Sequence, residues 1–158
     1  MLNLSMNFSY SIQMRRNKDK YVWWWGSNIY SIAKYLNDNN IRRVGVFVWE
    51  VHKNLQFLSS DKIFPWLINI NHFAPRPFES LQRQAYEDIV QQCSLSWSKG
   101  ESCYILIGRD DHYYYNEMNL LKTVASDYKK KIVLEKEFIS KGDKNLLYRI
   151  EWGFFMMD

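Results

Sequence analysis

The residues of this chain that could do chemistry follow two short apolar runs. Glu50 and His52 come directly after the run 44–49, which itself ends in Trp49. The second run, 103–108, is followed by Arg109, Asp110, Asp111, His112 and Tyr113. Carboxylates and imidazoles together can hold a divalent metal or carry general acid–base chemistry. They can also bind a sugar, because Trp49 and Tyr113 offer flat apolar faces and carboxylates accept hydrogen bonds from hydroxyl groups.

The two apolar runs decide whether these side chains meet. Each run is rich in β-branched, aromatic and other apolar residues, which is typical of a strand buried on both faces. In an open α/β sheet, ligands bind at the carboxyl ends of the parallel strands. If the two strands are neighbours, all these side chains converge on one crevice as candidate ligand-binding residues. The alternative is structural, because strand ends are commonly polar and an Asp-Asp-His run before a helix stabilises the helix dipole.

Other signatures of chemistry are absent from the sequence. Glycine is too sparse for a dinucleotide fingerprint, and neither a phosphate-binding loop nor a Gly-x-Ser-x-Gly elbow is present. The two cysteines, Cys93 and Cys103, cannot supply a four-ligand zinc site by themselves. They form either a disulfide, in an oxidising compartment, or two unpaired thiols. We therefore expect no cofactor, and we assign no catalytic residue and no metal ligand.

The spacing of apolar residues predicts the elements around the two central strands. Helices are predicted at 27–36, 51–58, 78–93 and 115–128. The stretch 63–70 is strand-like but contains Pro65, which favours an edge position. The stretches 131–138 and 145–152 predict a hairpin, and 94–101 is expected to be a loop. The predicted fold class is therefore α/β, with a Rossmann-like layered sheet, parallel central strands and a C-terminal antiparallel hairpin.

Length and composition indicate a single α/β domain, 1–158, in which 1–20 form an edge strand or a tether. Hydrophobic residues make up 47% of the chain and aromatic residues 17%, which excludes a disordered tail. The net charge of +4 is mild, and the run Lys129-Lys130-Lys131 is expected to be a solvated edge. No nucleic-acid partner is therefore expected. The aromatic stretch 21–25 either packs under the first helix or docks onto a surface outside the chain.

Several stretches of the chain resemble one family. They are 27–36 (SNIYSIAKYL), 46–49 (VFVW), 54–59 (NLQFLS) and 145–150 (NLLYRI). Their order is similar to that of the extracytoplasmic C-terminal domains of bacterial GT-C type membrane glycosyltransferases. These enzymes are relatives of the dolichyl-phosphate-mannose protein mannosyltransferases. This chain departs from the family pattern at Val48, where the family has Asp, and at Glu50, where the family has Gly.

The resemblance implies an accessory domain, because the catalytic carboxylate of that enzyme class lies between transmembrane helices. It implies a location on the extracytoplasmic face of a membrane, whereas without it we expect a cytoplasmic protein. The implied partners are the transmembrane part of the parent protein and a glycan or lipid-linked sugar. The aromatic stretch 21–25 would then lie near the membrane interface. Two other functions stay open: a stand-alone metal-dependent enzyme with its site at the strand ends, and a protein-interaction module that uses the Trp-rich face.

Overall fold

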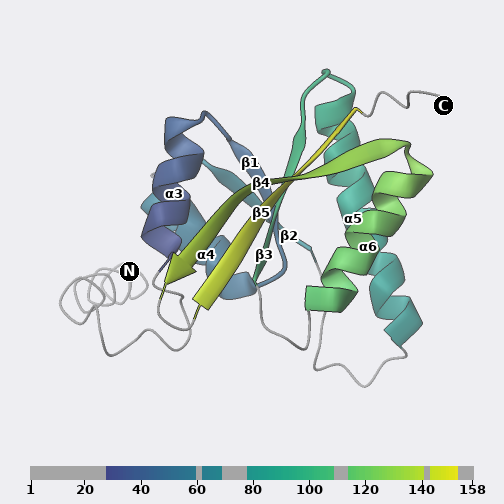
Figure 1. Cartoon of the computed structure of the whole chain (residues 1–158), viewed down its shortest axis with the longest axis horizontal. Coiled ribbons are helices and arrows are strands. Elements are labelled where there is room, and N and C mark those ends of the chain that lie inside the picture. Colours follow the sequence, from purple (N-terminus) through teal and green to yellow (C-terminus); the bar gives the residue numbers. More distant parts are fainter. Residues whose placement is uncertain (1–27, 60–61, 69–77, 109–113, 141–142, 153–158) are drawn as a thin grey trace, which may run out of the picture.

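The protein is a mixed sheet covered by helices on both faces. A computed structural model describes residues 28–59, 62–68, 78–108, 114–140 and 143–152 (Figure 1). The elements in chain order are α3 (Ile29–Asp38), β1 (Arg43–Val46), α4 (Trp49–Leu58), β2 (Phe64–Leu67), α5 (Phe78–Trp97), β3 (Cys103–Gly108), α6 (Tyr114–Asp127), β4 (Lys130–Ser140) and β5 (Asp143–Trp152). The predicted tether 1–20 and the aromatic stretch 21–25 lie outside the described residues.

The five strands of the described sheet have the order β2-β1-β3-β5-β4. Strand β1 pairs in parallel with both β2 and β3, and Val46 stands opposite Leu106. The two predicted central strands are therefore neighbours and parallel, as expected from their composition. Strand β2, which contains Pro65, lies at one edge of the sheet as predicted. The hairpin of β4 and β5 is antiparallel, and β5 joins it to β3.

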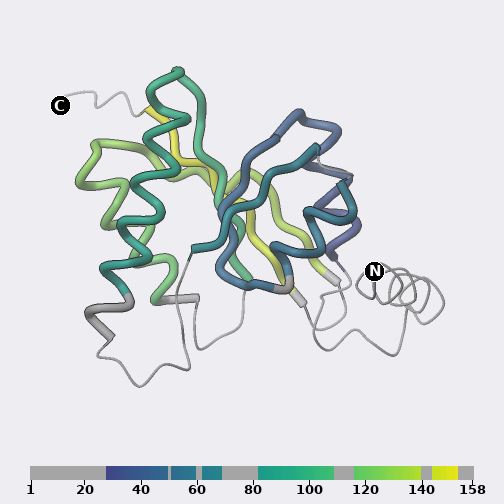
Figure 2. Tube along the Cα trace, turned by 180° about the vertical axis from the view of Figure 1, so that it is seen from behind, coloured from purple at the N-terminus to yellow at the C-terminus, as the bar shows by residue number. Residues whose placement is uncertain are grey.

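The helices form two groups on opposite faces of this sheet (Figures 1 and 2). Alternate residues of a strand point to opposite faces, so each strand contributes to two cores. Ile105 and Ile150 pack in the core that includes residues of α5 and α6, such as Ile89 and Leu121. Leu106 and its partner on β5, Leu147, pack in the other core, under α3 and α4. The sheet is therefore the middle of three layers.

Several element boundaries differ from the prediction, and three of them bear on the site. Strand β1 ends at Val46, and α4 already begins at Trp49. Helix α5 continues to Trp97, although serines at 94 and 96 predicted a loop there. Trp97 is buried, and its Nε1 donates a hydrogen bond of 3.3 Å to the carbonyl of Ile150. This contact with the sheet outweighs the weak helix propensity of serine.

None of the described helices is both long enough and apolar enough to cross a membrane.

Candidate functional site

The predicted crevice corresponds to the carboxyl ends of β1 and β3. Because these strands are parallel neighbours, the start of α4 and the stretch 109–113 leave from adjacent strand ends. Trp49, Glu50 and His52 all lie in the first turn of α4. The other candidate residues, Arg109, Asp110, Asp111, His112 and Tyr113, lie outside the described residues. The strand pairing that the crevice requires is therefore present. The stretch 109–113, which would form the second wall of the crevice, lies outside the described residues.

Trp49 presents an accessible aromatic face at this end of the sheet. Its side chain is 55% exposed, and its neighbour Val48 is also exposed. The Nζ atom of Lys53, one turn further along α4, lies 5.8 Å from the centre of the indole ring. An indole that is accessible on one face and close to a cation can stack on a sugar ring or lie at a membrane interface.

His52 is directed toward β2, on the side of β1 away from β3. Burial lowers the pKa of this histidine, the charge of Lys53 lowers it further, and a hydrogen bond to the backbone of Pro65 partly offsets both effects. Its Nδ1 atom is buried and has no hydrogen-bond partner in the described part of the chain. A histidine with a lowered pKa is neutral at pH 7, so it can accept a proton or a hydrogen bond but adds no charge.

Within the described ranges, no three His, Cys, Asp or Glu side chains come close enough together to hold a metal ion. Most of the carboxylates and imidazoles proposed for a metal site belong to 109–113 and fall outside those ranges. The described residues thus supply Trp49 and His52 to this end of the sheet, but no metal centre.

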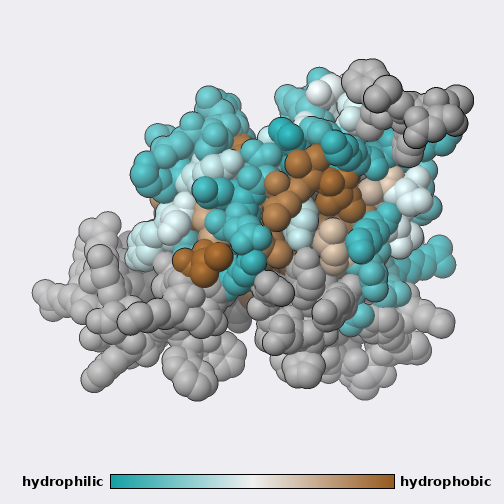
Figure 3. Space-filling model, viewed as in Figure 1, coloured by the Kyte–Doolittle hydropathy of each residue, from teal (hydrophilic) through white to brown (hydrophobic). Residues whose placement is uncertain are grey.

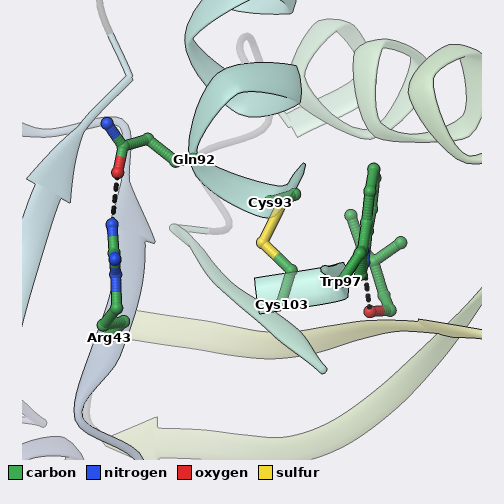
Figure 4. The surroundings of a disulfide bond; sticks show 6 residues. Arg43, Gln92, Cys93, Trp97 and Cys103 are labelled. Atoms are coloured by element: carbon green, nitrogen blue, oxygen red, sulfur yellow. Dashed lines mark hydrogen bonds between the residues drawn. A yellow bond between two sulfur atoms is a disulfide. The ribbon is translucent and has the colours of Figure 1, made fainter. Parts of the chain in front are cut away.

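The two cysteines form a disulfide between α5 and β3 (Figure 4). Cys93 lies in α5, and Cys103 is the first residue of β3, so the bond ties a covering helix directly to a central strand. Both residues are buried in the same hydrophobic core. Of the two states left open by the sequence, the structure contains the disulfide. Beside it, Arg43 at the start of β1 donates a hydrogen bond to Gln92, which holds the same part of α5 against the sheet.

An aromatic recess at the opposite end of the sheet was not predicted from the sequence. It has a volume of about 310 Å³, and it is lined by Ser94, Trp97, Ser98, Tyr128, Lys130 and Trp152. These residues come from the end of α5, the turn after α6, the start of β4 and the end of β5. No short motif connects them, because only the pairing of Lys130 with Trp152 and the packing of α5 bring them together. The feature of the sequence that pointed to such a recess was the high tryptophan content.

The burial of Lys130 corrects one expectation. The run Lys129-Lys130-Lys131 was expected to be a solvated edge, and Lys129 and Lys131 are indeed exposed. Lys130, in contrast, is only 8% exposed. Successive residues of a strand point to opposite faces, so a run of like residues at a strand start cannot all face water.

Figure 3 shows a hydrophobic area on one face of the molecule. In the same view in Figure 1, strand β4 crosses this area. Leu134 and Ile139 are the large exposed apolar side chains of this edge strand. The strand also carries the exposed charges of Lys131 and Lys136, and the register shifts between Leu134 and Lys136. Charges and bulges on an edge strand disfavour pairing with another chain.

Comparison of the chain with family models, curated proteins and solved structures finds no match. Any function must therefore be argued from the residues and their geometry.

Proposed function

We propose that this chain is a non-catalytic, extracytoplasmic accessory domain of a membrane glycosyltransferase-like protein, and that it contacts a glycan or lipid-linked sugar. In this proposal the sheet is Rossmann-like, and the contact lies at the carboxyl ends of its parallel strands. The transmembrane part of the same parent protein is the proposed partner.

The disulfide is the observation that carries the proposal. Cys93 and Cys103 are joined inside the hydrophobic core, between α5 and β3. Structural disulfides persist in oxidising compartments and are rare in the reducing cytosol. A buried disulfide therefore supports the extracytoplasmic location that the family resemblance implies, and it argues against the cytoplasmic alternative.

The placement of the resembling stretches gives further support. The stretch 27–36 coincides with most of α3, the stretch 46–49 joins β1 to α4, and 54–59 covers the end of α4. They thus form one contiguous helix–strand–helix unit. Val48, which replaces the Asp of the family pattern, is the N-cap of α4 and makes no side-chain capping hydrogen bond. Asp is a preferred N-cap residue, so the family pattern fits this position of the fold even though this chain departs from it.

The exposed indole of Trp49 supports contact with a sugar. It lies at the end of the sheet where α/β proteins bind ligands, and its face is accessible. The lowered pKa of His52 favours the uncharged imidazole at pH 7, so this side chain can offer a hydrogen bond without adding a charge beside Lys53.

The first experiment is to read the native gene on both sides of this segment. We expect the same reading frame to encode hydrophobic transmembrane helices before the segment. A complete native reading frame without such helices would contradict the proposal.

The second experiment measures binding of a polyprenyl-phosphate sugar in detergent micelles. We expect the chain to bind it and Trp49→Ala to weaken binding by about tenfold, which corresponds to the loss of one well-packed aromatic contact. Phe64→Ala is the matched control, because Phe64 is also an exposed aromatic residue but lies at the start of β2, at the amino ends of the parallel strands. Equal binding by the Trp49 variant, or no binding by the native chain, would count against sugar contact at this end.

The alternative of a stand-alone metal-dependent enzyme that uses Glu50, His52, Asp110 and His112 gains no support from the described residues. The imidazole of His52 is directed toward Pro65 on β2, away from β3. Calorimetric titration with Mg²⁺, Mn²⁺ and Zn²⁺ tests this alternative directly.

A further inference from the structure

The aromatic recess has the composition of a ligand site. Its described lining combines three aromatic side chains, two serine hydroxyls and one ammonium group, with no carboxylate among these residues. Trp152 is 59% exposed, and the ammonium of Lys130 lies over one face of its indole. The volume of about 310 Å³ is at the lower limit of small-molecule sites, which fits one ring rather than an extended chain.

The side chain of Lys130 packs between aromatic rings, and the residue as a whole is only 8% exposed. Its Nζ lies over the indole of Trp152 and 4.9 Å from the ring centre of Trp97. Within the described residues, none of its N–H donors forms a hydrogen bond or an ion pair. An ammonium has three donors, and aromatic faces stabilise its charge without supplying an acceptor oxygen. Burial without an anion lowers the pKa of Lys130. An anionic oxygen that enters the recess would relieve this cost.

The walls of the recess are held in place before any ligand binds. The indole N–H of Trp97 donates to the carbonyl of Ile150, which fixes the inner wall. The ring of Tyr128 lies 5.5 Å from that of Trp97, at 37° to it. Between Tyr128 and Lys130, Lys129 has a φ of 51°, in the left-handed region that side-chain-bearing residues rarely adopt. This turn allows both neighbours of Lys129 to line the recess.

Two described carboxylates neighbour lining residues along the chain, and both are already engaged. Glu151, next to Trp152, forms an ion pair of 3.1 Å with Arg149. Tyr86 Oη donates a hydrogen bond of 2.8 Å to Asp127 Oδ2, which ties α5 to the end of α6. Asp127 is therefore held outside the recess, and it is not among the lining residues. Among the described lining residues, a cationic ligand would meet the charge of Lys130 with no carboxylate to offset it. The recess thus favours an anion over a cation.

We propose that this recess binds a monosaccharide that carries a carboxylate, with the sugar ring packed against the exposed edge of the Trp152 indole and the carboxylate on the ammonium of Lys130. The hydroxyls of Ser94, Ser98 and Tyr128 are available to hydrogen-bond the ring hydroxyls. Ser98 Oγ already donates to the carbonyl of Leu95, so it serves as an acceptor. This site lies at the end of the sheet opposite Trp49. It goes beyond the proposed function and does not depend on the chain belonging to a membrane enzyme.

The test is a titration of the whole chain with glucuronate, glucose and acetate, followed through the indole N–H signals of tryptophan in NMR spectra. We expect glucuronate to shift the signals of Trp97 and Trp152 and to bind at least about tenfold more tightly than glucose, because a charge-assisted hydrogen bond is added. The Trp152 signal is identified by its loss in Trp152→Leu.

Three variants test the roles of the residues. Lys130→Met should reduce the affinity for glucuronate to that for glucose, whereas Trp152→Leu should weaken both. Lys131→Met is the matched control, since it removes the same charge from an exposed neighbour, and it should change the affinity less than about twofold.

The proposal is overturned if glucuronate shifts neither signal, or if Lys130→Met binds glucuronate as tightly as the native chain. Equal affinities for acetate and glucuronate overturn it as well, because the sugar ring would then contribute nothing. Should Lys130→Met fail to fold, Trp152→Leu decides, since its exposed side chain leaves the core intact. Unchanged glucuronate binding in that variant rejects the contact with Trp152 on which the proposal depends.

Discussion

The indole of Trp66 lies directly over Gly45, its partner on the neighbouring parallel strand. A Cβ atom at position 45 would lie 2.6 Å from Cζ2 of Trp66, which is closer than non-bonded atoms approach. Trp66 packs against the core that includes residues of α5 and α6. The glycine in the middle of β1 therefore makes room for an aromatic side chain from the edge strand, which covers β1 on this face.

Gly45→Ala should lower the free energy of unfolding by about 1–3 kcal/mol, the usual cost of forcing an extra carbon into a packed core. The measurement is urea unfolding followed by circular dichroism. In a Trp66→Leu background the same substitution should cost clearly less, because the clashing ring is gone. An equal cost in both backgrounds would show that the contact with Trp66 is not the cause.

Loss of the disulfide should lower the free energy of unfolding by about 2–4 kcal/mol. The bond joins Cys93 of α5 to Cys103 of β3, ten residues apart, and it restricts the unfolded chain. Urea unfolding of the oxidised and reduced protein measures the effect. In the double variant Cys93→Ala, Cys103→Ala, added reductant should change nothing. Identical unfolding midpoints for the oxidised and reduced native chain would contradict a stabilising role.

His52 should make the protein less stable in mild acid. Burial lowers its pKa below the ordinary value of 6.5, so the unfolded chain binds more protons than the folded chain as the pH falls below that value. The contribution to stability is complete above the ordinary pKa and is lost as the pH falls toward the folded pKa. Urea midpoints measured from about pH 7.5 down to about pH 5 should decrease less steeply in His52→Gln than in the native chain.

Lys53→Met provides the comparison for His52. The charge of Lys53 is the second cause of the lowered pKa, after burial, so its removal should reduce the pH dependence without abolishing it. A native pH profile in both variants would mean that His52 is not the titrating group.

Tyr86 should remain protonated in alkaline solution well beyond an ordinary tyrosine. Its hydrogen bond to Asp127 raises its pKa to about 12, because ionisation would place two negative charges side by side. The difference in tyrosinate absorbance between the native chain and Tyr86→Phe isolates this group. The difference should develop near pH 12 and not near the ordinary value of 10.0. A difference that develops at the ordinary value would mean that the contact between α5 and α6 is open in solution.

The candidate site could be predicted only in part, and the reason is visible in individual residues. Strands β1 and β3, which lead to Trp49 and Gly108, were correctly predicted to be parallel neighbours, because buried parallel strands have a recognisable apolar composition. The direction of His52 toward β2 was not predictable, since it depends on how α4 rotates against the sheet. For 109–113, which supplies the remaining candidates, the prediction stands as made.

The sequence by itself determined the fold class, the approximate positions of the helices and strands, the edge position of the strand with Pro65, and the C-terminal hairpin. These features follow from local spacing and residue type, which act within one element at a time. Only the tertiary structure decided that Cys93 bonds to Cys103, that α5 continues to Trp97, and that Lys130 is buried between two indoles. Each of these depends on side chains from different elements meeting in space, and their packing outweighs the local preference of the residues.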